Sequence, residues 1–196
     1  MKSKAVWTSG VAFLLLTVLL AIVAPAANAQ AKHVRWDIIQ PGNPLLPGGS
    51  LSAKADNGSK ITLTGTGTFV APAIGQGSSD AVTGGGTWKI DTPSASGTYE
   101  VEGLVRFDEA PGTLVGTGLT DTIGELEDAS AGLVILSILY SDGERGILVV
   151  SCTLPGSPPT VFEGITLSKG SWIFSTPCKP FRHYSMSRTS LKSLQH

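Results

Sequence analysis

Apolar and polar residues alternate strictly between Lys60 and Val70, and this pattern limits the segment to an extended strand with one face toward a core. Ile61, Leu63 and Phe69 fall on one face, and glycines occupy its remaining positions at 65 and 67. The other face carries threonine at 62, 64, 66 and 68. Inward glycines predict a tight bend or a close approach of backbones. A row of threonines is typical of the solvent face of a strand.

A second alternating segment runs from Thr98 to Asp108, with Tyr99 and Phe107 on its inward face. Further strands are expected at 32–39, 83–91, 132–141, 144–152, 160–167 and 172–175, separated by turns rich in glycine, proline and serine. The pattern predicts an all-β fold, a single-domain antiparallel β-barrel of about seven to eight strands, with a β-sandwich as the alternative. We favour the barrel because inward glycines suit tightly coiled strands and closure leaves no exposed edge.

Residues 1–29 have the organisation of a secretory signal peptide. Lys2 and Lys4 give a positive start, an apolar run follows over residues 11–24, and residues 27–29 read Ala-Asn-Ala, a small-x-small cleavage signal. The alternative is a membrane anchor, which Pro25 and Asn28 disfavour because they fall where a span is still apolar. We therefore expect cleavage after residue 29, a secreted, periplasmic or extracellular protein, and no membrane attachment afterwards.

The rest of the chain divides into a β-barrel domain over 30–176 and a basic, flexible C-terminal tail over 177–196. The tail contains no acidic residue, and its basic residues are Lys179, Arg182, Arg188 and Lys192. The formal net charge of the whole chain is −1, and two of its lysines lie in the leader, so the domain itself is acidic. An acidic domain repels phosphate backbones, which argues against a nucleic-acid partner.

The exported chain contains two cysteines, Cys152 and Cys178. An even number of cysteines in an exported protein predicts a disulfide. Such a bond would close a loop worth about 3–4 kcal/mol of stability in the chain-entropy model. The alternative is a pair of free thiols.

The segment from Gly132 to Cys152 has the strongest hairpin signal, because Asp-Gly at 142–143 is typical of a two-residue type I′ turn. That turn places Leu139 opposite Gly146. Both faces are then apolar, although antiparallel sheets usually leave one face polar. Such a hairpin needs cover from within the protein or from another subunit, so the candidates for a homo-oligomer interface are Val134, Leu136, Ile138, Tyr140, Ile147 and Val149.

We identify no catalytic residues, metal ligands or cofactor site in the sequence. The histidines lie near the two ends of the exported chain, at 33, 183 and 196, and neither a G-x-S-x-G nor an H-E-x-x-H motif is present. Glu100 and Glu102 share one face of a strand, but that face is the outward one, where carboxylates are typical of a solvated surface.

The barrel interior remains as a candidate binding site, because small exported barrels often hold a small apolar ligand. Its lining would be Phe69, Trp88, Tyr99, Phe107 and Trp172. Three functions follow: non-catalytic binding of an apolar ligand or a partner, a structural or surface-interaction role with oligomerisation through the 133–151 hairpin, and an isomerase or cyclase built on the cavity. A hollow interior would favour the first or third function. A filled core with an exposed apolar patch would favour the second.

Overall fold

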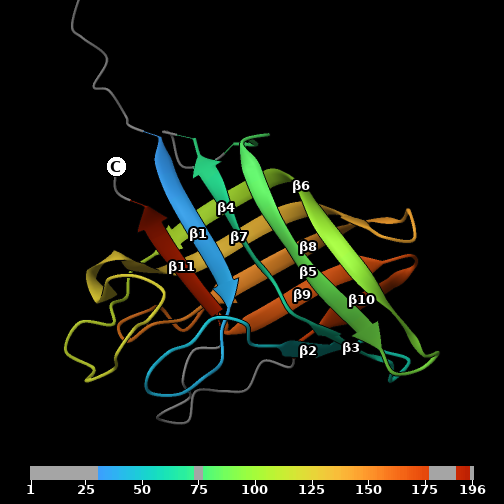
Figure 1. Ribbon diagram of the computed structural model, residues 1–196, viewed down its shortest axis with the longest axis horizontal. Coiled ribbons are helices and arrows are strands. Elements are labelled where there is room, and N and C mark those ends of the chain that lie inside the picture. Colours follow the sequence, from blue (N-terminus) through green and yellow to red (C-terminus); the bar gives the residue numbers. More distant parts are fainter. Residues whose placement is uncertain (1–30, 73–76, 177–188, 195–196) are drawn as a thin grey trace, which may run out of the picture. The chain divides into compact units, whose positions relative to one another are not determined.

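The computed structural model describes residues 31–72, 77–176 and 189–194 (Figure 1). The chain divides after Gln30, and Ala31–His196 forms one compact unit. The predicted signal peptide, Cys178 and the first part of the predicted tail lie outside the described residues. Within the three described ranges, no helix has the length and apolar character that a membrane span requires.

The all-β prediction is confirmed. A single three-residue 3-10 turn, η1 (Leu126–Asp128), accompanies the strands. The described strands are β1 (Lys32–Ile38), β2 (Leu51–Lys54), β3 (Lys60–Leu63), β4 (Thr66–Ala71), β5 (Val82–Ile90), β6 (Ala95–Ala110), β7 (Ala129–Tyr140), β8 (Arg145–Cys152), β9 (Gly164–Lys169), β10 (Trp172–Ser175) and β11 (Thr189–Leu194).

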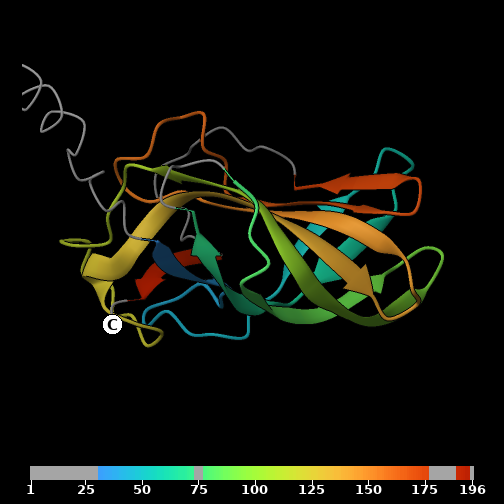
Figure 2. The ribbon, with the colours of Figure 1, turned by 90° about the horizontal axis from the view of Figure 1, so that it is seen from above.

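These strands form one antiparallel sheet whose ends meet in a ring. The neighbour order is β11-β1-β4-β5-β3-β2-β10-β9-β8-β7-β6, and the additional pairings of β5 with β6 and of β11 with β7 close it. Figures 1 and 2 show β1, β4 and β5 on one side of the ring, with β7, β8 and β9 crossing on the other. The largest fully buried side chains between them include Trp36, Tyr99, Tyr140, Phe69 and Phe174.

The predicted strand over residues 60–70 is two strands, β3 and β4, with a break at Thr64 and Gly65. Both β3 and β4 pair with β5 along one edge. Along the other edge, β3 pairs with β2 and β4 pairs with β1. A Cβ atom on Gly65 would lie 2.2 Å from the Tyr99 hydroxyl and 2.9 Å from the Trp36 ring. The strand therefore bends where two large rings approach its backbone, as inward glycines predict.

Two strands, β2 and β11, were not expected from the sequence. β2 lies in a segment rich in glycine and proline that we expected to be a loop, and it buries Leu51 and Ala53. β11 lies within the segment expected to be a tail, and it pairs with β1 on one edge and with β7 on the other. β2 has four residues and pairs mainly with the next strand, β3, whereas both neighbours of β11 are far away in the sequence. Strands this short give weak residue patterns.

The predicted register of the β7–β8 hairpin is wrong by one residue. Leu139 lies opposite Arg145 instead of Gly146, because the loop is three residues long. The Tyr140 amide donates to the Glu144 carbonyl at 2.8 Å, and Gly143 takes a φ of 86°, as in the three-residue loop with a bulge.

The one-residue shift moves every β8 side chain to the other face of the sheet. Leu148 and Val150 therefore join the fully buried face of β7, where they lie opposite Leu136 and Val134. Of the six interface candidates, only Ile147 and Val149 lie on the outward face. The other four are buried inside the ring: Val134, Leu136, Ile138 and Tyr140.

Candidate functional site

Four of the five aromatic residues expected to line a cavity lie inside the ring, and each of them packs against another aromatic ring. Phe69, Trp88, Tyr99 and Phe107 are 1–7 % exposed. The Phe69 and Phe107 ring centroids are 5.1 Å apart in an edge-on arrangement, the geometry that favours aromatic packing. Trp88 and Tyr99 both pack on Tyr140, with centroid distances of 5.8 Å and 6.4 Å.

Trp172 is separate from this group. It is half-buried on β10, and its ring packs on Phe174 at 6.1 Å. The structure therefore brings four of the five candidates into the aromatic core and places the fifth beside another ring.

Glycines make the room that these rings occupy. A Cβ atom would lie 2.7 Å from Trp36 Nε1 if placed on Gly67, and 2.9 Å from Tyr140 Cε2 if placed on Gly146. Side chains and glycine backbone thus meet directly, which is how a packed interior is built. Among the described residues, the Trp36 indole N–H is a buried donor without a hydrogen-bond partner.

Lys169 of β9 fills the space beside Trp88 and Tyr140. Its side chain is 9 % exposed, and Nζ lies 4.5 Å from the Trp88 ring centroid and 4.3 Å from that of Tyr140. Nζ also donates hydrogen bonds to Asp142 at 2.5 Å and to Glu144 at 2.7 Å. Two rings and two carboxylates make a cation site, and the chain's own lysine occupies it.

These contacts change the titration of the neighbouring groups. The hydrogen bond from Lys169 lowers the pKa of Asp142. Burial, with smaller contributions from the charges of Asp142 and Glu144, raises the pKa of the Tyr140 phenol well above its usual value. The Tyr140 hydroxyl donates to the Ser168 carbonyl at 2.9 Å, so it is a structural donor. Sequence reasoning missed Lys169, although it continues the inward alternation of Ile165 and Leu167.

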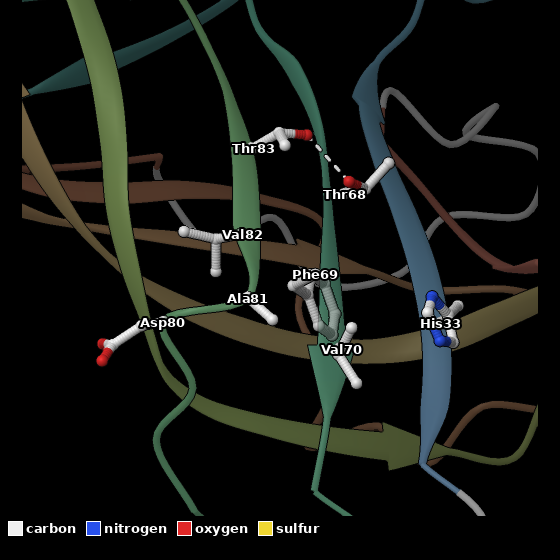
Figure 3. Close-up of a pocket in the computed structure, with 8 residues that line it drawn as sticks. All are labelled: His33, Thr68, Phe69, Val70, Asp80, Ala81, Val82 and Thr83. Atoms are coloured by element: carbon white, nitrogen blue, oxygen red, sulfur yellow. Dashed lines mark hydrogen bonds between the residues drawn. The ribbon is translucent and has the colours of Figure 1, made fainter.

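A shallow pocket of about 310 Å³ opens between β1, β4 and the start of β5 (Figure 3). Phe69 is the only cavity candidate that contributes to it. His33 and Asp80 are its two titratable residues, and Figure 3 shows them on opposite sides, with Asp80 directed away from His33. This arrangement does not form an acid–base pair, and the volume is at the lower limit for ligand sites. The lining is His33, Thr68, Phe69, Val70, Asp80, Ala81, Val82 and Thr83.

The outward side of the β7–β8 hairpin is apolar, and we call it the outer apolar face: Leu133, Ile135, Leu139, Ile147 and Val149. Ile147 is 40 % exposed, and the other four are partly exposed. Ile135 lies directly opposite Val149, and the next outward pair joins Ile147 to Ser137, the one polar residue between Leu133 and Leu139 on this side of β7. On nearby β10, Ile173 is 67 % exposed.

Two ion pairs border the outer apolar face. Arg145 bonds to Glu102 at 3.0 Å, and Arg106 bonds to Asp108 at 2.6 Å. The two carboxylates that the sequence pairs on β6, Glu100 and Glu102, are both exposed, and Glu102 is engaged by Arg145. The border therefore carries both signs of charge, as in the polar rim of a protein interface.

Neither the arrangement of metal-binding residue types nor comparison with known proteins indicates a further site. Within the described ranges, no group of three or more histidine, cysteine, aspartate or glutamate side chains could hold a metal ion. Comparison with protein-family models, curated proteins and solved structures finds no match to this chain. The function is therefore argued from the chain's own residues.

Proposed function

We propose that this protein is an exported, non-catalytic β-barrel that assembles with a second copy of itself through the outer apolar face. The observation that carries the proposal is the apolar character of that face, where strands in contact with water would alternate. Ile135, Ile147 and Val149 give up water contact when they meet another apolar surface, and each buried Å² of apolar area contributes roughly 25 cal/mol.

A second copy is favoured as the partner by the charges at the border. In a two-fold interface each patch meets its own copy, so a border of one sign would repel itself. Arg145–Glu102 and Arg106–Asp108 each place both signs at the border, and such a border can meet its copy without net repulsion. The charges therefore fit self-association.

The packed interior favours this role over a ligand cavity or a barrel enzyme. Trp88 and Tyr140 contact each other, and Lys169 fills the cation site beside them. An isomerase or cyclase needs an open cavity with convergent polar groups. Here the Lys169 ammonium bonds to Asp142 and Glu144, and the Tyr140 hydroxyl bonds to the Ser168 carbonyl.

We further propose cleavage of residues 1–29, export, and a disulfide between Cys152 and Cys178. Cys152 is fully buried at the end of β8, and Cys178 lies outside the described residues. A thiol assay on the denatured, unreduced protein should detect almost no free thiol. Two reactive thiols per chain would contradict the disulfide.

The assembly is tested by native mass spectrometry of the mature protein across the micromolar range. The wild type should be a dimer, and Ile147→Asp should be a folded monomer, because a carboxylate buried at an apolar interface lacks a partner. Thr87→Asp is the matched control, since Thr87 is exposed on the outer side of β5. A monomeric wild type, or equal dimerisation of both variants, would overturn the proposal.

A further inference from the structure

β11 occupies a groove between two strands that do not pair with each other. Its register with β1 runs from His33 opposite Leu194 to Ile38 opposite Thr189. Its other edge pairs with β7 at Ser130 and Ala129. Removal of this strand would open the β1 edge and the adjoining part of β7, so the groove has the backbone groups needed to add one antiparallel strand.

The groove also holds two specific side chains of β11. Leu191 is fully buried, and it lies opposite Trp36 of β1. The Lys192 side chain is 3 % exposed and forms an ion pair with Asp121, whose side chain is 1 % exposed. An extended strand with adjacent leucine and lysine therefore fits this groove in one register.

The Lys192 side chain is held by residues of the loop between β6 and β7, and we call this site the lysine socket. Lys192 Nζ donates to the Glu125 carbonyl at 3.0 Å, in addition to its ion pair with Asp121. A Cβ atom on Gly124 would lie 3.2 Å from Lys192 Cδ, so the loop closes tightly on the side chain. A strand that enters the groove gains a charged anchor as well as backbone pairing.

The loop is itself fixed to the segment that follows β1. The Asn43 side chain donates to the Gly118 carbonyl at 3.1 Å and accepts from the Thr120 amide at 2.8 Å. The Leu45 amide also donates to the Thr120 carbonyl at 2.8 Å. These contacts involve no residue of β11, so they hold the Asp121 side of the socket independently of the strand that fills it.

We propose that β11 exchanges between two copies of the chain, so that each copy's C-terminal strand pairs in the β1/β7 groove of the other. With Cys178 bonded to Cys152 as proposed above, residues 179–188 remain between this bond and β11, and ten residues span up to about 35 Å when extended. Exchange forms the same contacts in either copy, which makes it a low-cost route to a dimer. The outer apolar face takes no part, so this inference does not depend on the proposed function.

The test uses a disulfide that records which copy supplies the strand. His33 and Leu194 are register partners on β1 and β11, so His33→Cys with Leu194→Cys places two thiols at cross-strand distance. The background is the full chain with Ile147→Asp, which removes assembly through the outer apolar face. The protein is refolded at increasing concentration, oxidised, and separated by size without reductant.

If strands exchange, the fraction of covalent dimer should rise about tenfold as the refolding concentration approaches millimolar. A segment on a short linker has an effective concentration in that range, so pairing between copies then competes with pairing within one copy. An equal mixture of isotope-labelled and unlabelled chains should give mixed dimers as half of the dimer population. Cross-linked monomer at every concentration would overturn the proposal. Equal dimer formation by His33→Cys alone would also overturn it, because that variant has no thiol on β11.

Discussion

The two sides of the ring share an apolar inner face and differ on the outside. Over β3, β4 and β5 the outer side chains are threonines that bond in pairs: Thr64 with Thr87 at 2.8 Å and Thr68 with Thr83 at 2.7 Å. Over β7 and β8 the corresponding positions carry Ile135, Ile147 and Val149, among other apolar residues. A strand needs one apolar face to fold, and the second apolar face of the hairpin is the surface that the proposed assembly would cover.

The threonine side illustrates what a sheet face in contact with water needs. The sequence predicted only one threonine row, and the structure places Thr83 and Thr87 of β5 beside it. Their hydroxyls bond across strands and remain accessible to water. On the outward side of β7, among the residues of the outer apolar face, only Ser137 carries a hydroxyl, which bonds to the Gly103 carbonyl at 3.3 Å. This contrast with the threonine side is what the following variants test.

The largest effect is expected from Ile138→Asp, which places a carboxylate on the fully buried inner face of β7. An unpartnered buried charge costs several kcal/mol, enough to unfold a domain of ordinary stability. Ile147→Asp on the outward face should change the monomer's free energy of unfolding by less than about 0.5 kcal/mol. Urea denaturation measures both values, and equal destabilisation would show that the two faces of the hairpin are equally buried.

Gly65→Ala tests the inner side beneath the threonines. The new methyl group would collide with the Tyr99 hydroxyl and the Trp36 ring, so we expect a loss of about 1–3 kcal/mol in the free energy of unfolding. Gly42→Ala is the control, because its Cβ would meet only the Pro44 carbonyl oxygen, at 3.4 Å. Thermal unfolding of the two variants compares them, and an unchanged Gly65→Ala protein would contradict a packed interior.

Alkaline pH should weaken the core between the two sides. Burial raises the pKa of both Tyr99 and Tyr140 above their usual value of 10.0. The unfolded chain therefore loses these protons first, and the free energy of unfolding falls as the pH rises above that value. Phenolate absorbance of the folded protein should appear at higher pH than in the urea-unfolded chain. Identical titration curves would mean that these phenols are open to water.

A small effect on stability and none on assembly are expected from Thr68→Val on the threonine side. It removes one hydroxyl of an exposed pair, and the free energy of unfolding should change by about 0.5–1 kcal/mol at most. The subunit number should not change, because this face takes no part in the proposed assembly. Sedimentation velocity checks the mass. A shift to monomer would show that the subunits meet through the threonine side of the ring, and this would contradict assembly through the outer apolar face.

Local alternation was enough to predict much of the fold. The pattern from Lys60 to Val70 identified the inward residues correctly, and Ile61, Leu63 and Phe69 are buried. The hairpin was also correctly located, but Asp-Gly suits both two-residue and three-residue loops. That single ambiguity shifted the register and assigned Ile147 and Val149 to the wrong set of neighbours.

Contacts between distant segments were not predictable in the same way. β11 depends on β1 and on a loop that supplies Asp121 to Lys192, and neither partner is visible in the local sequence of the strand. Lys169 was missed because a lysine that follows an apolar alternation is usually solvated. Here two aromatic rings from β5 and β7 and two carboxylates near a turn meet around it.

The central claim, that the outer apolar face is covered by a second copy, is tested most directly by hydroxyl-radical footprinting of the mature protein at increasing concentration. Oxidation of Leu139 and Ile147 should fall as the dimer forms, while Val115, which is 50 % exposed in a loop, should react equally at all concentrations. Unchanged oxidation of Leu139 and Ile147 in a protein that has dimerised would contradict the account.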